Sequence, residues 1–247
     1  MNGLGLSMST KISVDDLAGD LFSLNIRGLR SIAILWARPS AYFDAADDAE
    51  WKDSYTPSVR LWLSLIALSS LLQVIWLSPT SPIVMAYADG FREAGLALPG
   101  TLTFPALGEE AAVLIFTAFP IVQLLTFLFI LPLFRVWGRE TTFSLRVRYG
   151  FATMIPSASL MMIILPGMAG LPSGWASSFG WAIGLVAMTV DTITVHRSGV
   201  HETAGTWRWL RALLIAVIVL GLNVIMHAIT QVAGIIFISV KYGLAPA

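Results

Sequence analysis

The sequence contains no cysteine, so it cannot form a disulfide, a thiolate metal site or an active site with a cysteine nucleophile. Charged residues are also scarce, at 12% of the chain against roughly a quarter in soluble domains. The 15 basic and 15 acidic residues cancel, which leaves no net charge to attract nucleic acid. Apolar residues make up 56% of the sequence, and the mean hydropathy is +0.77. This composition is typical of integral membrane proteins.

Five segments are long and apolar enough to cross a bilayer, which takes about 20 residues of helix because hydrocarbon offers the backbone no other hydrogen-bond partner. They run over residues 57–76, 111–134, 143–165, 175–195 and 210–240. The sequence therefore predicts an all-α polytopic membrane protein with a bundle of five transmembrane helices over residues 55–247. A cytoplasmic arm with interfacial amphipathic helices is predicted over residues 1–54. The fifth segment is longer than a bilayer requires, so we expect it to tilt, bend or protrude.

Basic residues lie in alternate connections between these segments. Six lie in the N-terminal arm up to Arg60, four in the second connection and three in the fourth, whereas only Arg92 and Lys241 lie on the opposite side. The positive-inside rule then predicts a cytoplasmic N-terminus and an external C-terminus. Lys11 and Asp15 interrupt the first twenty residues, so we expect no cleavable signal peptide.

Short amphipathic helices are predicted on both membrane surfaces. Residues 24–38 present an apolar face opposite Arg27, Arg30 and Arg38, and a second helix starts at Pro39. The acidic side of that second helix is either a docking surface for a partner or a solvated face; it includes Asp44, Asp47 and Asp48. A second group of arginines is interpreted as contacts to lipid headgroups or a partner protein: Arg135, Arg139, Arg146 and Arg148.

On the outer surface, Ser81 and Pro82 predict the start of another amphipathic helix, with Tyr87 and Phe91 facing the membrane. The stretch 95–108 contains two prolines and several glycines, and we interpret it as an irregular connector. A re-entrant lid is the alternative.

Polar side chains recur near the middle of the predicted spans. Gln123 lies in the second span, and Asn223, His227 and Gln231 follow one another at four-residue spacing in the fifth, on one helix face. Because isolated polar groups are costly in hydrocarbon, we expect this face to point into the bundle. Two interpretations stay open: a site that binds a small polar ligand or relays a proton through His227, and interhelical hydrogen bonds that only hold the bundle together.

The fourth span carries two further features. Asp191 lies about one turn from its cytoplasmic end, where the helix dipole disfavours an acid. We expect an ion pair there with Arg146, Arg148, Arg197 or Arg211, with a proton-carrying role as the alternative. On the same helix, small residues at four-residue spacing are typical of close helix packing, within the chain or between copies: Ala176, Gly180 and Gly184.

No motif of an enzyme is present. The sequence has no glycine-rich phosphate loop, no GxSxG and no HExxH, and no two carboxylates fall at one membrane depth. We therefore expect no catalytic residue. One intramembrane histidine without a thiolate cannot complete a haem or tetrahedral zinc site within the chain, so we expect no metal and no cofactor.

Two stretches resemble a known family. The segment Trp36-Ala37-Arg38-Pro39-Ser40 and the run from Thr142 to Gly150 that leads to Pro156 look like bacterial members of the Yip family. The start of the first span, Tyr55-Thr56-Pro57 with Leu61-Trp62-Leu63, is similar to a related bacterial family of uncharacterised membrane proteins. The resemblance covers residues 24–222 and implies a five-helix bundle, which we expect in the inner membrane of a bacterium.

Eukaryotic Yip proteins bind small Rab-type GTPases. This chain lacks their cytoplasmic Asp-Leu-Tyr-Gly-Pro motif, and its Tyr149-Gly150 reverses their Gly-Tyr order, so Rab binding is not carried over. The leading expectation is a non-catalytic accessory, scaffold or assembly subunit that binds lipids and another membrane protein or a second copy of itself. The alternative is a small transporter or channel that uses Gln123, Asn223 and His227, and an enzyme acting on lipid comes third.

Overall fold

The computed structural model describes residues 26–48, 51, 54–137, 140–168, 176–200 and 205–244. This part of the chain is helical and contains no strand. Its α-helices are α2 (Ile26–Ala37), α3 (Pro39–Ala46), α4 (Ser58–Trp76), α5 (Pro82–Glu93), α6 (Phe104–Phe129), α7 (Phe143–Met168), α8 (Ala176–Arg197) and α9 (Thr206–Tyr242). Five of them, α4 and α6 to α9, are long and apolar enough to cross a membrane. The predicted fold class is confirmed, and the chain is an integral membrane protein.

The second predicted span is the one whose boundaries differ most from the structure. Helix α6 begins at Phe104, inside the stretch that was expected to be an irregular connector, so that expectation is wrong for its last residues. Thr103 explains the early start, because its hydroxyl accepts a hydrogen bond from the Ala106 N–H at 3.4 Å and caps the helix. Pro105 falls in the first turn, where its missing N–H costs no helical bond. After α6, the chain turns through the short 3₁₀ helices η2 (Leu131–Leu133) and η3 (Arg135–Trp137).

The five long helices close into a ring. Helix α4 packs against α6 and α7, α9 packs against α6 and α8, and α8 packs against α7. Most of α7 is buried, whereas the other four expose most of their surface. Those exposed surfaces are rich in large apolar side chains, as expected of helices that face lipid.

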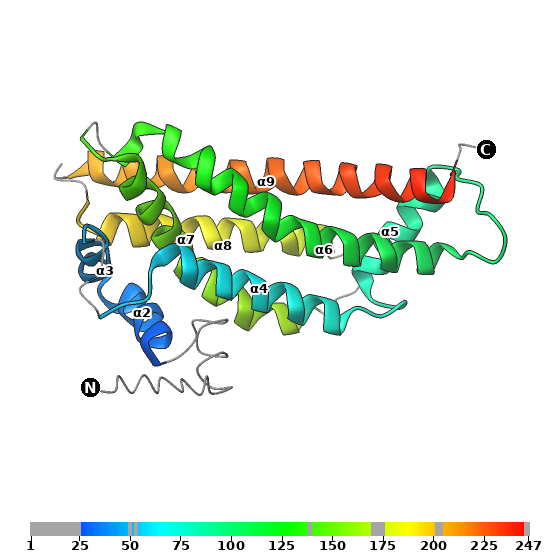
Figure 1. Cartoon of the computed structure of the whole chain (residues 1–247), viewed down its shortest axis with the longest axis horizontal. Helices are drawn as coiled ribbons and strands as arrows, with labels where there is room; N and C mark the ends of the chain where they lie inside the picture. Colours follow the sequence, from blue (N-terminus) through cyan, green and yellow to red (C-terminus); the bar gives the residue numbers. More distant parts are fainter. Residues whose placement is uncertain are drawn as a thin grey trace, which may run out of the picture.

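The two ends of the bundle are covered differently. Helices α2 and α3 lie at the end where α8 stops and α9 starts, and α5 lies at the other end, beside the end of α9 (Figure 1). Helix α9 is unbroken over its 37 residues, about 55 Å at 1.5 Å per residue, so it extends beyond a hydrocarbon core of about 30 Å. The Lys241 ammonium and the Tyr242 hydroxyl both donate to the Glu110 carboxylate, which fixes its far end to α6.

Aromatic packing fills the bundle towards the α2/α3 end. The ring of Trp62 lies edge-on to Phe151 and Phe127, with centroids 5.0 and 5.9 Å away. Tyr42 and Phe43 of α3 are fully buried in the same cluster. This packing places α4, α6 and α7 at fixed rotations, and so determines which of their side chains face the centre of the ring.

Candidate functional site

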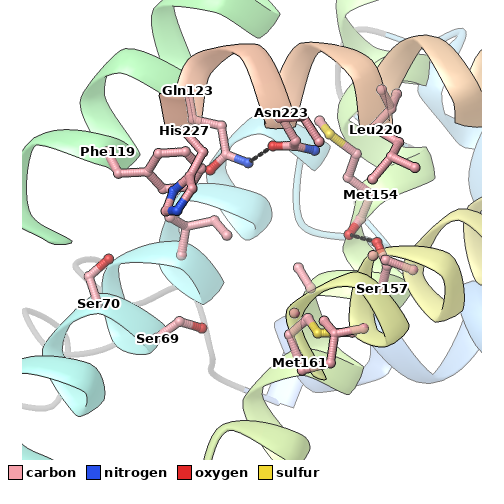
Figure 2. Close-up of a pocket in the computed structure, with 18 of the residues that line it drawn as sticks. Ser69, Ser70, Phe119, Gln123, Met154, Ser157, Met161, Leu220, Asn223 and His227 are labelled. Atoms are coloured by element: carbon pink, nitrogen blue, oxygen red, sulfur yellow. Dashed lines mark hydrogen bonds between the residues drawn. The ribbon is translucent and has the colours of Figure 1, made fainter. Parts of the chain in front are cut away.

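A cavity of about 830 Å³ lies between the five long helices, and each of them contributes to its wall (Figure 2). This volume is in the usual range of small-molecule sites, about 300–1,000 Å³. Aromatic, aliphatic and methionine side chains make up most of the lining. The polar lining residues are Ser69, Ser70, Gln73, Gln123, Ser157, Asp191, Asn223, His227 and Gln231. The polar residues that the sequence placed at mid-span in α6 and α9 therefore meet around one space.

One amide pair bridges α6 and α9 across this wall. The Nε2 of Gln123 donates a hydrogen bond to the Oδ1 of Asn223 (Figure 2). Gln123 is 7% exposed, and its Oε1 has no hydrogen-bond partner among the described residues. A buried acceptor that is left unpaired is costly, so the pair joins two helices and also leaves one buried acceptor of the cavity wall without a partner.

His227 belongs to a second polar group nearer to the α5 end. Its Nε2 lies 2.9 Å from the Nε2 of Gln231, one turn further along α9. Because an amide nitrogen can only donate, the imidazole accepts here. Gln231 also donates to the Tyr87 hydroxyl of α5 at 3.4 Å, and burial raises the pKa of Tyr87. The Phe119 ring packs edge-on against the imidazole, with centroids 5.4 Å apart. These polar contacts lead from α5 into the cavity.

Asp191 lies in the cavity wall nearer to the α2/α3 end. Its side chain is 3% exposed, and its Oδ1 has no partner among the described residues. Ser157 of α7 lies beside this carboxyl group, and its hydroxyl donates to the Met154 carbonyl at 3.0 Å. A carboxyl group at this depth is expensive to keep charged without a cation or a set of donors.

The packing of α8 on α9 sets the spacing between the two titratable groups. Gly184 lies against Leu220, where an added Cβ would come 3.4 Å from the Leu220 Cδ1. From this contact, Asp191 is seven residues towards the α2/α3 end and His227 is seven residues towards the α5 end. The two therefore lie about 20 Å apart along the bundle axis, with Asn223 between them.

The predicted ion pair of Asp191 is wrong, because no ion pair in the described ranges includes this residue. The last carbonyls of a helix have no partner within it, and two of the candidate arginines bind such groups instead. Arg197 donates to the carbonyls of Trp36 and Ala37 at 3.3 and 2.7 Å, at the end of α2. Arg148 donates to the Ala46 carbonyl at 2.8 Å, at the end of α3.

The other arginines that the sequence assigned to lipid or partner contacts divide into two groups. Arg146 is held inside the chain by Thr141 and by the Pro132 carbonyl, at 2.9 and 3.2 Å. Four side chains are exposed and stay candidates for that contact: Arg27, Arg30, Arg38 and Arg135. Arg139 lies outside the described residues.

Close packing within the chain, one of the two alternatives predicted for the small residues of α8, is not found at Gly180 or Gly184. An added Cβ at Gly180 would meet nothing within 4 Å, and the contact at Gly184 is an ordinary one. Both glycines line the cavity instead. The close approaches occur at Gly108, Gly150 and Gly234, where a Cβ would overlap α5, the Leu131 side chain of η2 and α6 respectively. Nothing is described of the Ala176 side chain, and self-association through this face stays a prediction.

Helix α4 contributes three polar groups that the sequence reasoning missed. Ser69, Ser70 and Gln73 line the cavity wall opposite His227, and Ser69 and Ser70 can be followed in Figure 2. Their spacing of three and four residues on an apolar helix is the signal that could have identified them as one inward face. Among the residues that the structure describes, no three histidine or carboxylate side chains could together hold a metal ion.

No protein-family model, curated protein or solved structure matches this chain. The resemblance to the bacterial Yip family therefore stays a prediction.

Proposed function

We propose that the chain is a small membrane transporter whose solute binds in the cavity at the centre of the five-helix bundle. The observation that carries this proposal is that two residues of the cavity wall, Gln123 and Asp191, each hold a buried oxygen without a hydrogen-bond partner among the described residues, Oε1 and Oδ1 respectively. Polar groups that only hold helices together satisfy one another, because an unpaired polar group inside a bundle destabilises it. Unpaired acceptors on residues that line a space of ligand size are better explained by a ligand that supplies the missing bonds.

Helix α8 is the wall element that we propose to move during transport. It is the least buried of the five long helices. An added Cβ at Gly180 would meet nothing within 4 Å, so nothing packs closely against α8 at this position. Movement of one wall past a central site exposes that site to each side of the membrane in turn.

The orientation proposed for this transporter follows the basic residues. We place α2 and α3 in the cytoplasm and α5 outside, in the inner membrane of a bacterium. The Asp191 end of the cavity then lies nearer the cytoplasm, and the His227 end lies nearer the exterior. Membrane lipids are the proposed contacts of the apolar outer surfaces.

The accessory or scaffold function ranks second in this proposal. Its candidate docking surface was the acidic side of α3, and part of that side is occupied within the chain, because the Tyr149 hydroxyl donates to the Asp47 carboxylate. The backbone oxygen of Asp48 likewise accepts from Arg148. These contacts support a structural role for the acidic side more than a docking role.

The lack of native cysteine allows a direct test by single-cysteine labelling. Ala228→Cys and Ala187→Cys place a thiol in the cavity wall on α9 and α8. Ile229→Cys is the matched control, because Ile229 is adjacent to Ala228, is 50% exposed and does not line the cavity. Each variant is reconstituted in sealed vesicles and treated from one side or the other with a membrane-impermeant maleimide.

A transporter should show reaction at both cavity positions from either side, and little reaction at Ile229→Cys, which faces lipid. Labelling of Ala228→Cys no faster than the control would show that the cavity is not reached by water and would end the proposal. Labelling from one side only would also contradict transport.

A further inference from the structure

The cavity lacks hydrogen-bond donors at two specific places. Among the described side-chain atoms that are buried without a partner, those in the cavity wall are Asp191 Oδ1 and Gln123 Oε1. Both are acceptors, so each needs an N–H or O–H group to approach it. A ligand group that completes either place must therefore present a donor there and not an acceptor.

The cavity wall also carries an acid without a basic partner. Its described lining contains no lysine or arginine, and Asp191 is its only carboxyl group. Helices α4, α6 and α7 add no charged side chain to the wall, and α9 adds one titratable group, His227, about 20 Å away along the axis. The nearby arginines Arg197 and Arg148 are bound to the ends of α2 and α3. A carboxylate here finds no cation in the described part of the chain.

The surroundings of Asp191 suit a cation that has an apolar body. Trp62 and Met154 line the cavity, and both lie four to six residues in from the contact between the Ser58 hydroxyl and the Arg148 carbonyl at the α2/α3 end. Asp191 lies six residues in from Arg197 at that same end, so the three side chains share one depth. Aromatic faces attract cations, most strongly where water is excluded.

We propose that the cavity binds an organic cation with N–H donors, an ammonium or guanidinium group, whose charge is held by Asp191. The apolar body of this ligand lies along Ile183 and Leu220, between α8 and α9. This inference rests on the proposed transport function and names its substrate class.

Three probes of one shape test the charge preference. Phenethylammonium is the cation, 2-phenylethanol its neutral counterpart and 3-phenylpropionate its anionic counterpart. Each is titrated into the purified full chain in non-ionic detergent, and binding is followed by the shift in the thermal unfolding temperature and by tryptophan fluorescence. The cation should bind at least tenfold more tightly than either counterpart, which corresponds to about 1.4 kcal/mol.

Two substitutions locate the charge. Asp191→Asn keeps the shape of the side chain and should remove the tenfold preference, and Asp191→Glu should retain a preference for the cation. Asp44→Asn is the matched control, because Asp44 is an exposed acid on α3, and it should bind the cation as the unaltered chain does. Should Asp191→Asn fail to fold, the comparison of the three probes on the unaltered chain still decides the matter.

A cation that binds no more tightly than phenylethanol, or an Asp191→Asn variant that keeps the preference, would overturn the inference.

Short-chain phosphatidylethanolamine added as a competitor separates two sources of the ammonium group. Competition assigns the group to a lipid headgroup, and the absence of competition assigns it to a soluble amine. Two-sided labelling of Ala228→Cys without cation preference would leave the transport proposal standing and remove this inference alone. If neither two-sided labelling nor a preference for the cation is found, the transport proposal itself is wrong.

Discussion

Gly108 is the position where one added methyl group should disturb the fold most clearly. It lies on α6 where α5 crosses, and an added Cβ would overlap the backbone oxygen of Val84 and lie 3.0 Å from the Ala88 nitrogen. Both neighbours are backbone atoms of α5, so no side chain can rotate away. Helices α5 and α6 would have to separate by roughly 1 Å to restore an ordinary C···O contact.

We expect Gly108→Ala to lower the free energy of unfolding by about 1–2 kcal/mol. Overpacking of this kind costs roughly 1–3 kcal/mol, and the higher helix propensity of alanine returns up to about 1 kcal/mol. For a chain of this size the midpoint temperature of thermal unfolding should fall by roughly 2–8 °C. Gly90→Ala is the matched control, because Gly90 lies on α5 with nothing within 4 Å of an added Cβ.

Thermal unfolding in detergent, followed by tryptophan fluorescence, measures both variants. A third variant, Gly234→Ala, should fall between them, because its added Cβ would meet the Ile115 side chain at 2.9 Å, which can rotate. The packing described for α5 predicts the order Gly108→Ala, Gly234→Ala, Gly90→Ala from least to most stable. Equal midpoints for Gly108→Ala and Gly90→Ala would refute the close contact between α5 and α6.

Two further predictions concern hydrogen bonds. A double-mutant cycle of Gln123→Ala and Asn223→Ala should give a coupling of roughly 0.6 kcal/mol in thermal unfolding, and independent effects would mean that the two amides do not meet. Tyr42→Phe should cost about 1 kcal/mol, since the Tyr42 hydroxyl donates to the Thr56 carbonyl at 2.6 Å. Burial raises the pKa of Tyr42 well above its ordinary value, so the stability from this group is complete below about pH 10 and is lost as pH rises, when the unfolded chain releases the proton first. Unfolding midpoints measured from pH 8 to 11 should therefore fall less steeply for Tyr42→Phe than for the unaltered chain, and parallel slopes would contradict this.

The membrane helices could be located from composition because their formation is a local property. Each span needs only its own run of apolar residues to satisfy its backbone in lipid, so its position follows from neighbouring residues alone. The exception at α6 has the same origin: Thr103 and Pro105 are helix-start signals that lie upstream of the apolar run, and hydropathy does not weigh them.

The inward direction of the polar stripe on α9 was also available from the sequence. The four-residue spacing of Asn223, His227 and Gln231 places them on one helix face whatever surrounds that helix, and the cost of polar groups in lipid turns the face inward. Each of the three lines the cavity.

The partners of the polar side chains could not be predicted from the sequence in the same way. Asp191 was expected to pair with an arginine because several were predicted at its membrane depth, yet Arg197 and Arg148 bind the last carbonyls of α2 and α3. The four-residue spacing of small residues on α8 is compatible with close helix packing. Only the structure shows that the space beside Gly180 is open. Partner choice depends on how each helix is rotated and shifted against its neighbours. The interdigitation of side chains from distant parts of the chain determines that rotation and register, so they emerge only when the whole bundle is packed.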